Sequence, residues 1–123
     1  MQAHAKPWAY IALIYFICAV SLGVYMGASH DHTLRSVHAH LNLLGWVSLT
    51  LTAVMYHFFP KAGQSKLART HFWLYNVGMP TMLVALLLLM QGHAGAEPGI
   101  VVGSLMTLSA VALFVINIYS HRA

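Results

Sequence analysis

His38 and His40 are the residues of this chain whose type and spacing point most clearly to chemistry. They lie in the stretch 35–60, which is long and apolar enough to cross a bilayer, where an ionisable side chain is costly unless it has a partner. Successive residues of an α-helix turn by about 100°, so a His-x-His pair projects its imidazoles roughly 200° apart. This spacing does not suit one small ion, but it suits one axial ligand on each side of the helix, each for a separate large planar cofactor. The pair therefore predicts haem ligation.

A simpler interpretation of His38 and His40 is a structural pair, hydrogen-bonded across helices at about 1 kcal/mol per bond in lipid. Arg35 lies one turn before His38 at the expected membrane edge, where a guanidinium could pair with a haem propionate. The role of an ordinary interfacial anchor explains Arg35 equally well.

Other histidines lie in the loops that follow the first and third apolar stretches. His30 and His32 flank Asp31, and imidazole and carboxylate are ligands for copper or zinc, so a copper site is one interpretation. We favour a solvated turn in which Asp31 or Thr33 caps the next helix, because so few ligands in a short loop seldom close a site alone. His93 could assist a metal or a propionate, although a solvated loop histidine is the favoured interpretation.

The composition identifies the class of protein to which these residues belong. With 59% hydrophobic and 7% charged residues in 123, the chain lacks the polar surface of a soluble domain of its size. We therefore predict an all-α integral membrane protein, with residues 1–123 forming a single four-helix transmembrane domain. The expected spans, each close to the ~20 residues that cross the hydrocarbon, are 8–26, 36–59, 70–90 and 98–119.

Basic residues predict the orientation of these spans. Five of the six lie before the first span, between the second and third, or after the fourth: Lys6, Lys61, Lys66, Arg69 and Arg122. Both termini are therefore predicted to be cytoplasmic, in the inner (cytoplasmic) membrane of a bacterium. The net charge of +4 fits this bias and does not indicate nucleic-acid binding, because no basic cluster is interleaved with exposed aromatic residues.

Several further residues in the spans have structural interpretations. Gly45 is expected to permit the close approach of a helix or a ring. Tyr56 and His71 are expected at the inner membrane interface, as part of an aromatic belt. Gly103 and Asn117 in the fourth span are suited to helix packing.

One segment of the chain resembles a known family. His38-Ala39-His40, then Leu44–Val47 (LGWV), then Tyr56 and Phe59-Pro60 resemble the tenth helix of haem-copper oxidase catalytic subunit I, in the cbb-type and nitric oxide reductase branch. His71–Leu74 (HFWL) is similar to the start of the eleventh helix, so the resemblance extends over four spans as helices nine to twelve. It implies that His38 ligates a high-spin haem and His40 a low-spin haem.

The differences from that family bear on the expected assembly and activity. The family has twelve spans in three four-helix arcs, and this chain corresponds to one third of that ring. A homotrimer would rebuild the ring, with His38 of one protomer and His40 of the next on one haem. The family's copper centre needs a His-His pair, which is absent from this sequence, so a stand-alone oxygen reductase is not expected.

The interpretation from sequence is thus a haem b membrane cytochrome with bis-histidine haem between protomers and an electron-transfer role. No C-x-x-C-H motif is present, so the expected haem is the non-covalent b type. Two alternatives stay open: a copper or haem handling protein for a respiratory oxidase, and a haem sensor that responds to nitric oxide or oxygen.

Overall fold

The computed structural model describes residues 1–122, and over them every regular element is helical. Four helical stretches are long and apolar enough to cross a membrane, at 6–29, 35–58, 66–90 and 94–120. Most of these stretches begin or end a few residues outside the predicted spans. The elements are α1 (Lys6–Ser29), α2 (Arg35–His40), η1 (Leu41–Val47), α3 (Ser48–Phe58), α4 (Pro60–Gly63), α5 (Lys66–Met90), η2 (Ala94–Ala96) and α6 (Glu97–Ser120).

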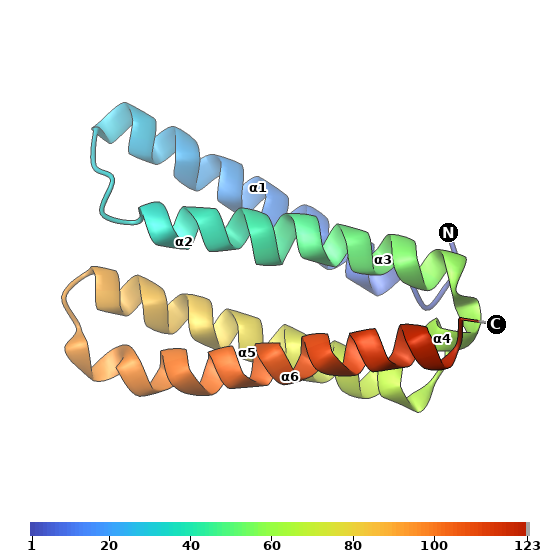
Figure 1. Cartoon of the computed structure of the whole chain (residues 1–123). Coiled ribbons are helices and arrows are strands. Elements are labelled where there is room, and N and C mark those ends of the chain that lie inside the picture. The colour runs from blue at the N-terminus through green and yellow to red at the C-terminus, as the bar shows by residue number, and fades with distance from the viewer. Residues whose placement is uncertain (123) are drawn as a thin grey trace.

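The chain forms two helical hairpins, α1 with α2–η1–α3, and α5 with α6 (Figure 1). The hairpins converge at the end of the bundle that holds both termini and α4, and they diverge toward the end that holds the loops after α1 and α5. Below, these are called the terminal end and the loop end. The α5–α6 pair is closely packed because Gly78 and Gly103 face each other, and a side chain on either would meet backbone atoms of the other helix.

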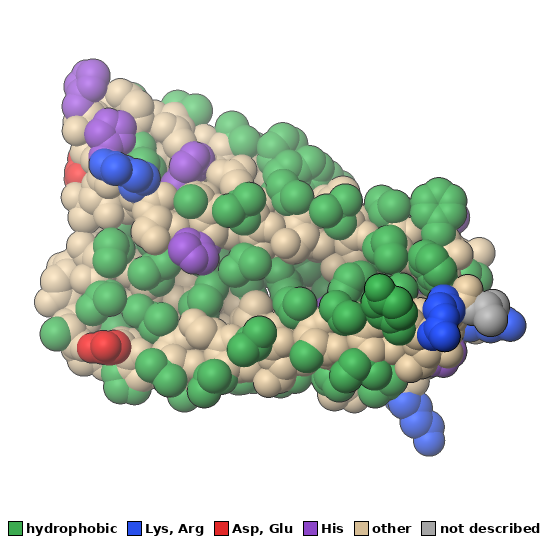
Figure 2. Space-filling model, viewed as in Figure 1, with side chains coloured by type: hydrophobic (Ala, Val, Ile, Leu, Met, Phe, Trp, Pro, Cys, Tyr) green, Lys and Arg blue, Asp and Glu red, His purple; other side chains and the backbone are tan. Residues whose placement is uncertain are grey.

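The two ends of the bundle differ in the charge of their side chains. Figure 2 shows Lys and Arg mostly at the terminal end, with a smaller basic patch at the loop end, where the acidic side chains of the visible face also lie. The loop end carries Asp31 and Glu97 with a single basic residue, Arg35. Between the ends the surface is largely apolar, with exposed residues such as Ile17, Leu105 and Leu108. This distribution is the one expected of a bundle surrounded by lipid.

The second span, predicted at 36–59, occupies residues 35–58 and is not a regular α-helix throughout. Its middle segment, η1, is π-helical. Two backbone carbonyls of this segment accept hydrogen bonds from side chains. The Ser48 hydroxyl donates to the Leu43 carbonyl at 2.6 Å, and the Tyr75 hydroxyl of α5 donates to the Leu44 carbonyl at 2.8 Å. Widened turns of this kind often occur at functional sites. This one begins at the residue after His40.

Gly45 has the role that its sequence context predicts. A Cβ atom at Gly45 would lie 2.7 Å from Cγ of Tyr15 on α1, so only glycine leaves room for this ring against η1. The buried core lies mainly toward the terminal end, and its largest fully buried side chains are Trp8, Leu49, Tyr56, His71, Met79 and Asn117.

Candidate functional site

His38 lies in the interface between α2 and α1. Its ring is half-buried, and Nδ1 is 3.0 Å from the backbone carbonyl oxygen of Ala19. Gly23, one turn further along α1, makes room for the ring, because a Cβ atom there would lie 2.8 Å from Cε1 of His38. The packing of α1 against α2 thus fixes the position of this imidazole. Sequence analysis did not identify Gly23, since nothing in its local sequence indicates which side chain it meets.

His40 is held differently, by its own helix. Its Nδ1 is 2.7 Å from the carbonyl oxygen of Ser36, one turn earlier, and its ring is also half-buried. Both histidines precede the π-helical segment, so the α-helical spacing of roughly 200° applies to them. His38 is bonded to α1, whereas His40 contacts no carbonyl of α1. On this helix the two residues lie on different faces, and their imidazoles are bonded to carbonyls of different helices.

The hydrogen bonds determine which ring nitrogen carries the proton. A carbonyl oxygen accepts hydrogen bonds and cannot donate them, so Nδ1 of both His38 and His40 must be the protonated nitrogen. In a neutral imidazole the lone pair is then on Nε2, for which residues 1–122 provide no hydrogen-bond partner in either case. A histidine that binds a metal through Nε2 ordinarily donates its Nδ1 proton to such a carbonyl. The donor set therefore fits axial ligation of haem iron.

Arg35 is exposed at the start of α2, one turn before His38. Its backbone N–H donates to the carbonyl of His32 at 3.2 Å, which closes the loop that leads into the helix. The location at the loop end agrees with either of its predicted roles, a propionate partner or an interfacial anchor.

The loop between α1 and α2 is organised by Asp31. One carboxylate oxygen accepts from the Thr33 hydroxyl at 2.6 Å and from the Thr33 backbone N–H at 3.0 Å. These two hydrogen bonds lower the pKa of the Asp31 carboxyl below its ordinary value. The prediction that Asp31 or Thr33 caps the next helix is wrong, because the N-cap residue is Leu34 and has no side-chain cap. Asp31 bonds Thr33 instead, since an aspartate readily closes a turn on a residue two positions ahead.

The loop histidines do not form a metal centre within the described part of the chain. His30, His32 and His93 are exposed. His30 ends α1 in the left-handed conformation, with φ of 55°. In residues 1–122 no group of three or more His, Cys, Asp or Glu side chains is placed to hold a metal ion. A copper site at these residues would therefore need ligands from another molecule.

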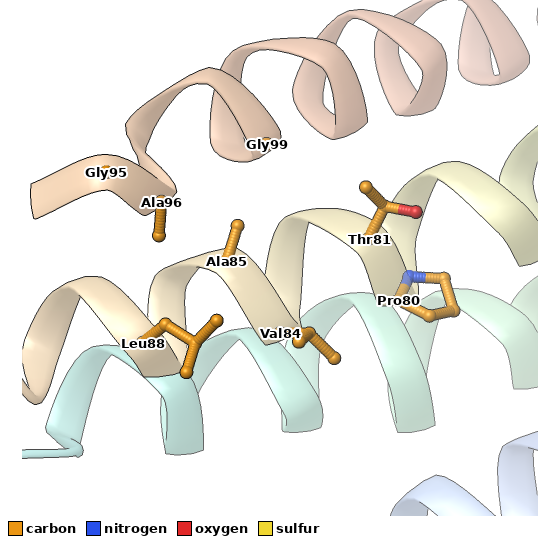
Figure 3. Close-up of a pocket in the computed structure, with 8 residues that line it drawn as sticks. All are labelled: Pro80, Thr81, Val84, Ala85, Leu88, Gly95, Ala96 and Gly99. Carbon is orange, nitrogen blue, oxygen red and sulfur yellow. The ribbon is translucent and has the colours of Figure 1, made fainter. Parts of the chain in front are cut away.

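A groove of about 560 Å³ lies between α5 and α6 at the loop end (Figure 3). Its lining is small or apolar, as with Ala85, Leu88 and Gly99, and includes no ionisable side chain, so the groove offers packing surface and no ligand. It shares Pro80 and Val84 with a smaller apolar cavity. That cavity is lined also by Val37 of α2 and Leu41 of η1, the residues on either side of the segment that holds the two histidines. Apolar surface thus continues from the histidine-bearing helix to α6.

The prediction that Tyr56 and His71 belong to an interfacial aromatic belt is wrong, because both side chains are buried and belong to a polar network. The Tyr56 hydroxyl is 2.8 Å from Nδ1 of His71, and the Asn117 amide donates to the same hydroxyl at 3.3 Å. Asn117 also accepts from the Ser65 hydroxyl at 2.9 Å. This network joins α3, α5 and α6, and Trp8 of α1 covers it by stacking on the His71 ring. In the sequence, the feature that could have indicated this network is the polar Asn117 within an apolar span.

Comparison with known proteins gives no relative for this chain: no protein-family model, curated protein or solved structure matches it.

Proposed function

We propose that this chain is a membrane cytochrome of b type, with His38 and His40 as axial ligands of haem iron. One observation supports this proposal most directly. Each ring donates its Nδ1 proton to a backbone carbonyl and leaves Nε2 free, on a helix that directs the two rings apart. The resemblance of the surrounding residues to the tenth helix of haem-copper oxidase subunit I supports it independently.

Haem iron with two histidine ligands transfers single electrons, so the proposed role is electron transfer and not oxygen reduction. The residues of this chain would hold and orient the group. The Ala19 carbonyl fixes the ring plane of His38, and the Ser36 carbonyl fixes that of His40. Arg35, exposed one turn away, supplies a guanidinium for a propionate at the loop end.

The proposed assembly is a homotrimer in the cytoplasmic membrane of a bacterium, with both termini on the cytoplasmic side. The two histidines of one chain point in different directions, so each haem is held by His38 of one protomer and His40 of its neighbour. A closed ring of three satisfies all ligands with one type of interface. Positively charged residues at the terminal end support the orientation.

The first test is a reduced-minus-oxidised visible spectrum, with a pyridine haemochrome assay, on detergent-purified protein. Wild type is expected to show a low-spin b-type spectrum that carbon monoxide does not shift. His38→Ala and His40→Ala are each expected to lose it or become high-spin. His57→Ala is the matched control, because His57 lies at the terminal end, where its Nδ1 accepts from the Gln2 backbone N–H. Colourless wild type after expression with ample haem would refute the cytochrome.

The second test concerns the assembly. His38→Ala and His40→Ala chains are co-expressed with different affinity tags, and mixed oligomers are purified. If each haem is shared between neighbours, one of the three interfaces in every mixed trimer combines two intact ligands, so about a third of the sites are restored. If both ligands of a haem come from one chain, or from equivalent residues of two chains in a symmetric dimer, this recovery pattern is not obtained. The mass of the complex, measured by light scattering, distinguishes three copies from two.

A further inference from the structure

A separate cavity of about 210 Å³ lies among η1, α3, α5 and α6, away from the two proposed ligands. Its walls are largely apolar, but four residues with polar side chains also line it, namely Ser48, Thr52, His71 and Tyr75. Leu51 and Val111 form part of the lining and are themselves 57% and 40% exposed on the bundle surface. The cavity therefore reaches the surface between apolar side chains of membrane-spanning helices, and a ligand would enter it from lipid.

His71 is the polar group that distinguishes this cavity from a packing defect. The side chain is 1% exposed, and its ring is stacked between Trp8 and Phe114, with centroid distances of 4.5 and 5.0 Å. Two aromatic rings therefore fix the plane of the imidazole, and the side chain lines the cavity.

The hydrogen-bond network assigns the proton on this ring. The Tyr56 hydroxyl accepts from the Asn117 amide, so its own single proton is available for Nδ1 of His71, 2.8 Å away. Nδ1 is then an acceptor and Nε2 carries the ring proton. Among residues 1–122 this Nε2–H has no acceptor, and because no fully buried polar side-chain atom is left without a partner, Nε2 must belong to the small exposed part of the side chain. The cavity thus presents a fixed donor that needs a partner.

Acceptors line the same cavity. The Ser48 hydroxyl proton is used on the Leu43 carbonyl and the Tyr75 hydroxyl proton on the Leu44 carbonyl. The lone pairs of both hydroxyl oxygens remain, so Ser48 and Tyr75 can accept. A fitting ligand is lipid-soluble and has an oxygen that accepts from His71, and a hydroxyl on it could donate to Ser48 or Tyr75. The volume is below the 300–1,000 Å³ that is typical of drug-sized ligands, so about one ring fits.

From this geometry we infer that the cavity binds the ring of a membrane quinone or quinol, with His71 donating to a ring oxygen. Such a compound is a lipid-soluble electron carrier, so this inference rests on the proposed function for the choice of ligand class. Ser48 lies eight residues beyond His40 on the same membrane-spanning stretch, which places the ring and the proposed haem in the same bundle. The binding itself requires no haem.

The test is quenching of intrinsic tryptophan fluorescence by decylubiquinone, with the full chain in lipid nanodiscs. Trp8 stacks on His71 and reports on the site. Wild type is expected to show saturable quenching above the linear background of lipid partitioning. Val111→Phe, which fills the mouth, and His71→Phe, which removes the donor, are each expected to weaken binding about tenfold or more. Val115→Phe, one turn along α6 and equally open to lipid, is the matched control.

Linear quenching that is equal in wild type, Val111→Phe and Val115→Phe would overturn the inference and leave only water in the cavity. Val111→Phe decides the question even if His71→Phe fails to fold, because Val111 makes no polar contact. Fluorescence quenching does not depend on bound haem. A colourless protein that still binds the quinone would reject the cytochrome alone, and a cytochrome without saturable quenching would reject the quinone site alone.

Discussion

Replacing Gly23 with alanine tests how α1 positions His38. The new Cβ would lie 2.8 Å from Cε1 of His38, closer than two carbon atoms can approach without movement. The ring can move by rotating about its side-chain bonds, but it then loses the 3.0 Å hydrogen bond from Nδ1 to the Ala19 carbonyl. One such bond contributes about 1 kcal/mol to stability.

Gly27→Ala is the matched control, because a Cβ at Gly27 meets nothing within 4 Å and lies on the same helix one turn later. Alanine is favoured over glycine in a helix by about 0.5–1 kcal/mol, so Gly27→Ala is expected to stabilise the protein by that amount. Gly23→Ala gains the same propensity and loses the bond, so it is expected to be about 1 kcal/mol less stable than Gly27→Ala. For a chain of this size that difference corresponds to about 4 °C in Tm.

Two assays on detergent-purified protein measure these effects. Thermal unfolding followed by circular dichroism gives the stability difference and needs no haem. The low-spin haem band, relative to protein, is expected to fall in Gly23→Ala and to stay at the wild-type level in Gly27→Ala, because a rotated His38 no longer presents Nε2 correctly. Equal stability and equal haem content in the two variants would refute the argument that Gly23 places the ring.

Three further outcomes are expected. Gly45→Ala should destabilise the protein by about 1–3 kcal/mol in thermal or denaturant unfolding, because the new Cβ would lie 2.7 Å from Cγ and 2.8 Å from Cβ of Tyr15. Wild-type stability would contradict this packing. Tyr56→Phe should cost about 1–3 kcal/mol in thermal unfolding, since it leaves Nδ1 of the buried His71 without a partner and removes one of the two hydrogen bonds that the Asn117 amide donates. The turn at Asp31 should weaken as the pH falls, because its carboxyl has a lowered pKa in the folded state. The stability that this carboxylate contributes is complete above the ordinary aspartate pKa and disappears as the pH falls through the lower pKa of the folded state. Amide hydrogen exchange at Thr33 should accelerate relative to neighbouring amides over that acidic range, and Asp31→Asn should abolish the pH dependence.

The local features of the chain could be predicted from its sequence. Four helical spans follow from long apolar runs, because crossing a membrane requires only sufficient length and hydrophobicity in one segment. The different directions of His38 and His40 follow from the geometry of a single helix turn. Gly45 also fits its prediction, although the sequence did not indicate that its partner is Tyr15.

Only the tertiary structure decided which side chains meet across helices. The pairing of His38 with Gly23, and the network in which His71 lies, join residues whose contact depends on how the helices pack. The π-helical segment also depends on a contact between helices, since the Tyr75 hydroxyl of α5 donates to one of its carbonyls. Hydropathy and helical periodicity describe one segment at a time, whereas steric fit and hydrogen-bond geometry between segments are properties of the packed bundle. That is why the sequence identified the candidate ligands, and the structure identified what holds them and the cavity beside His71.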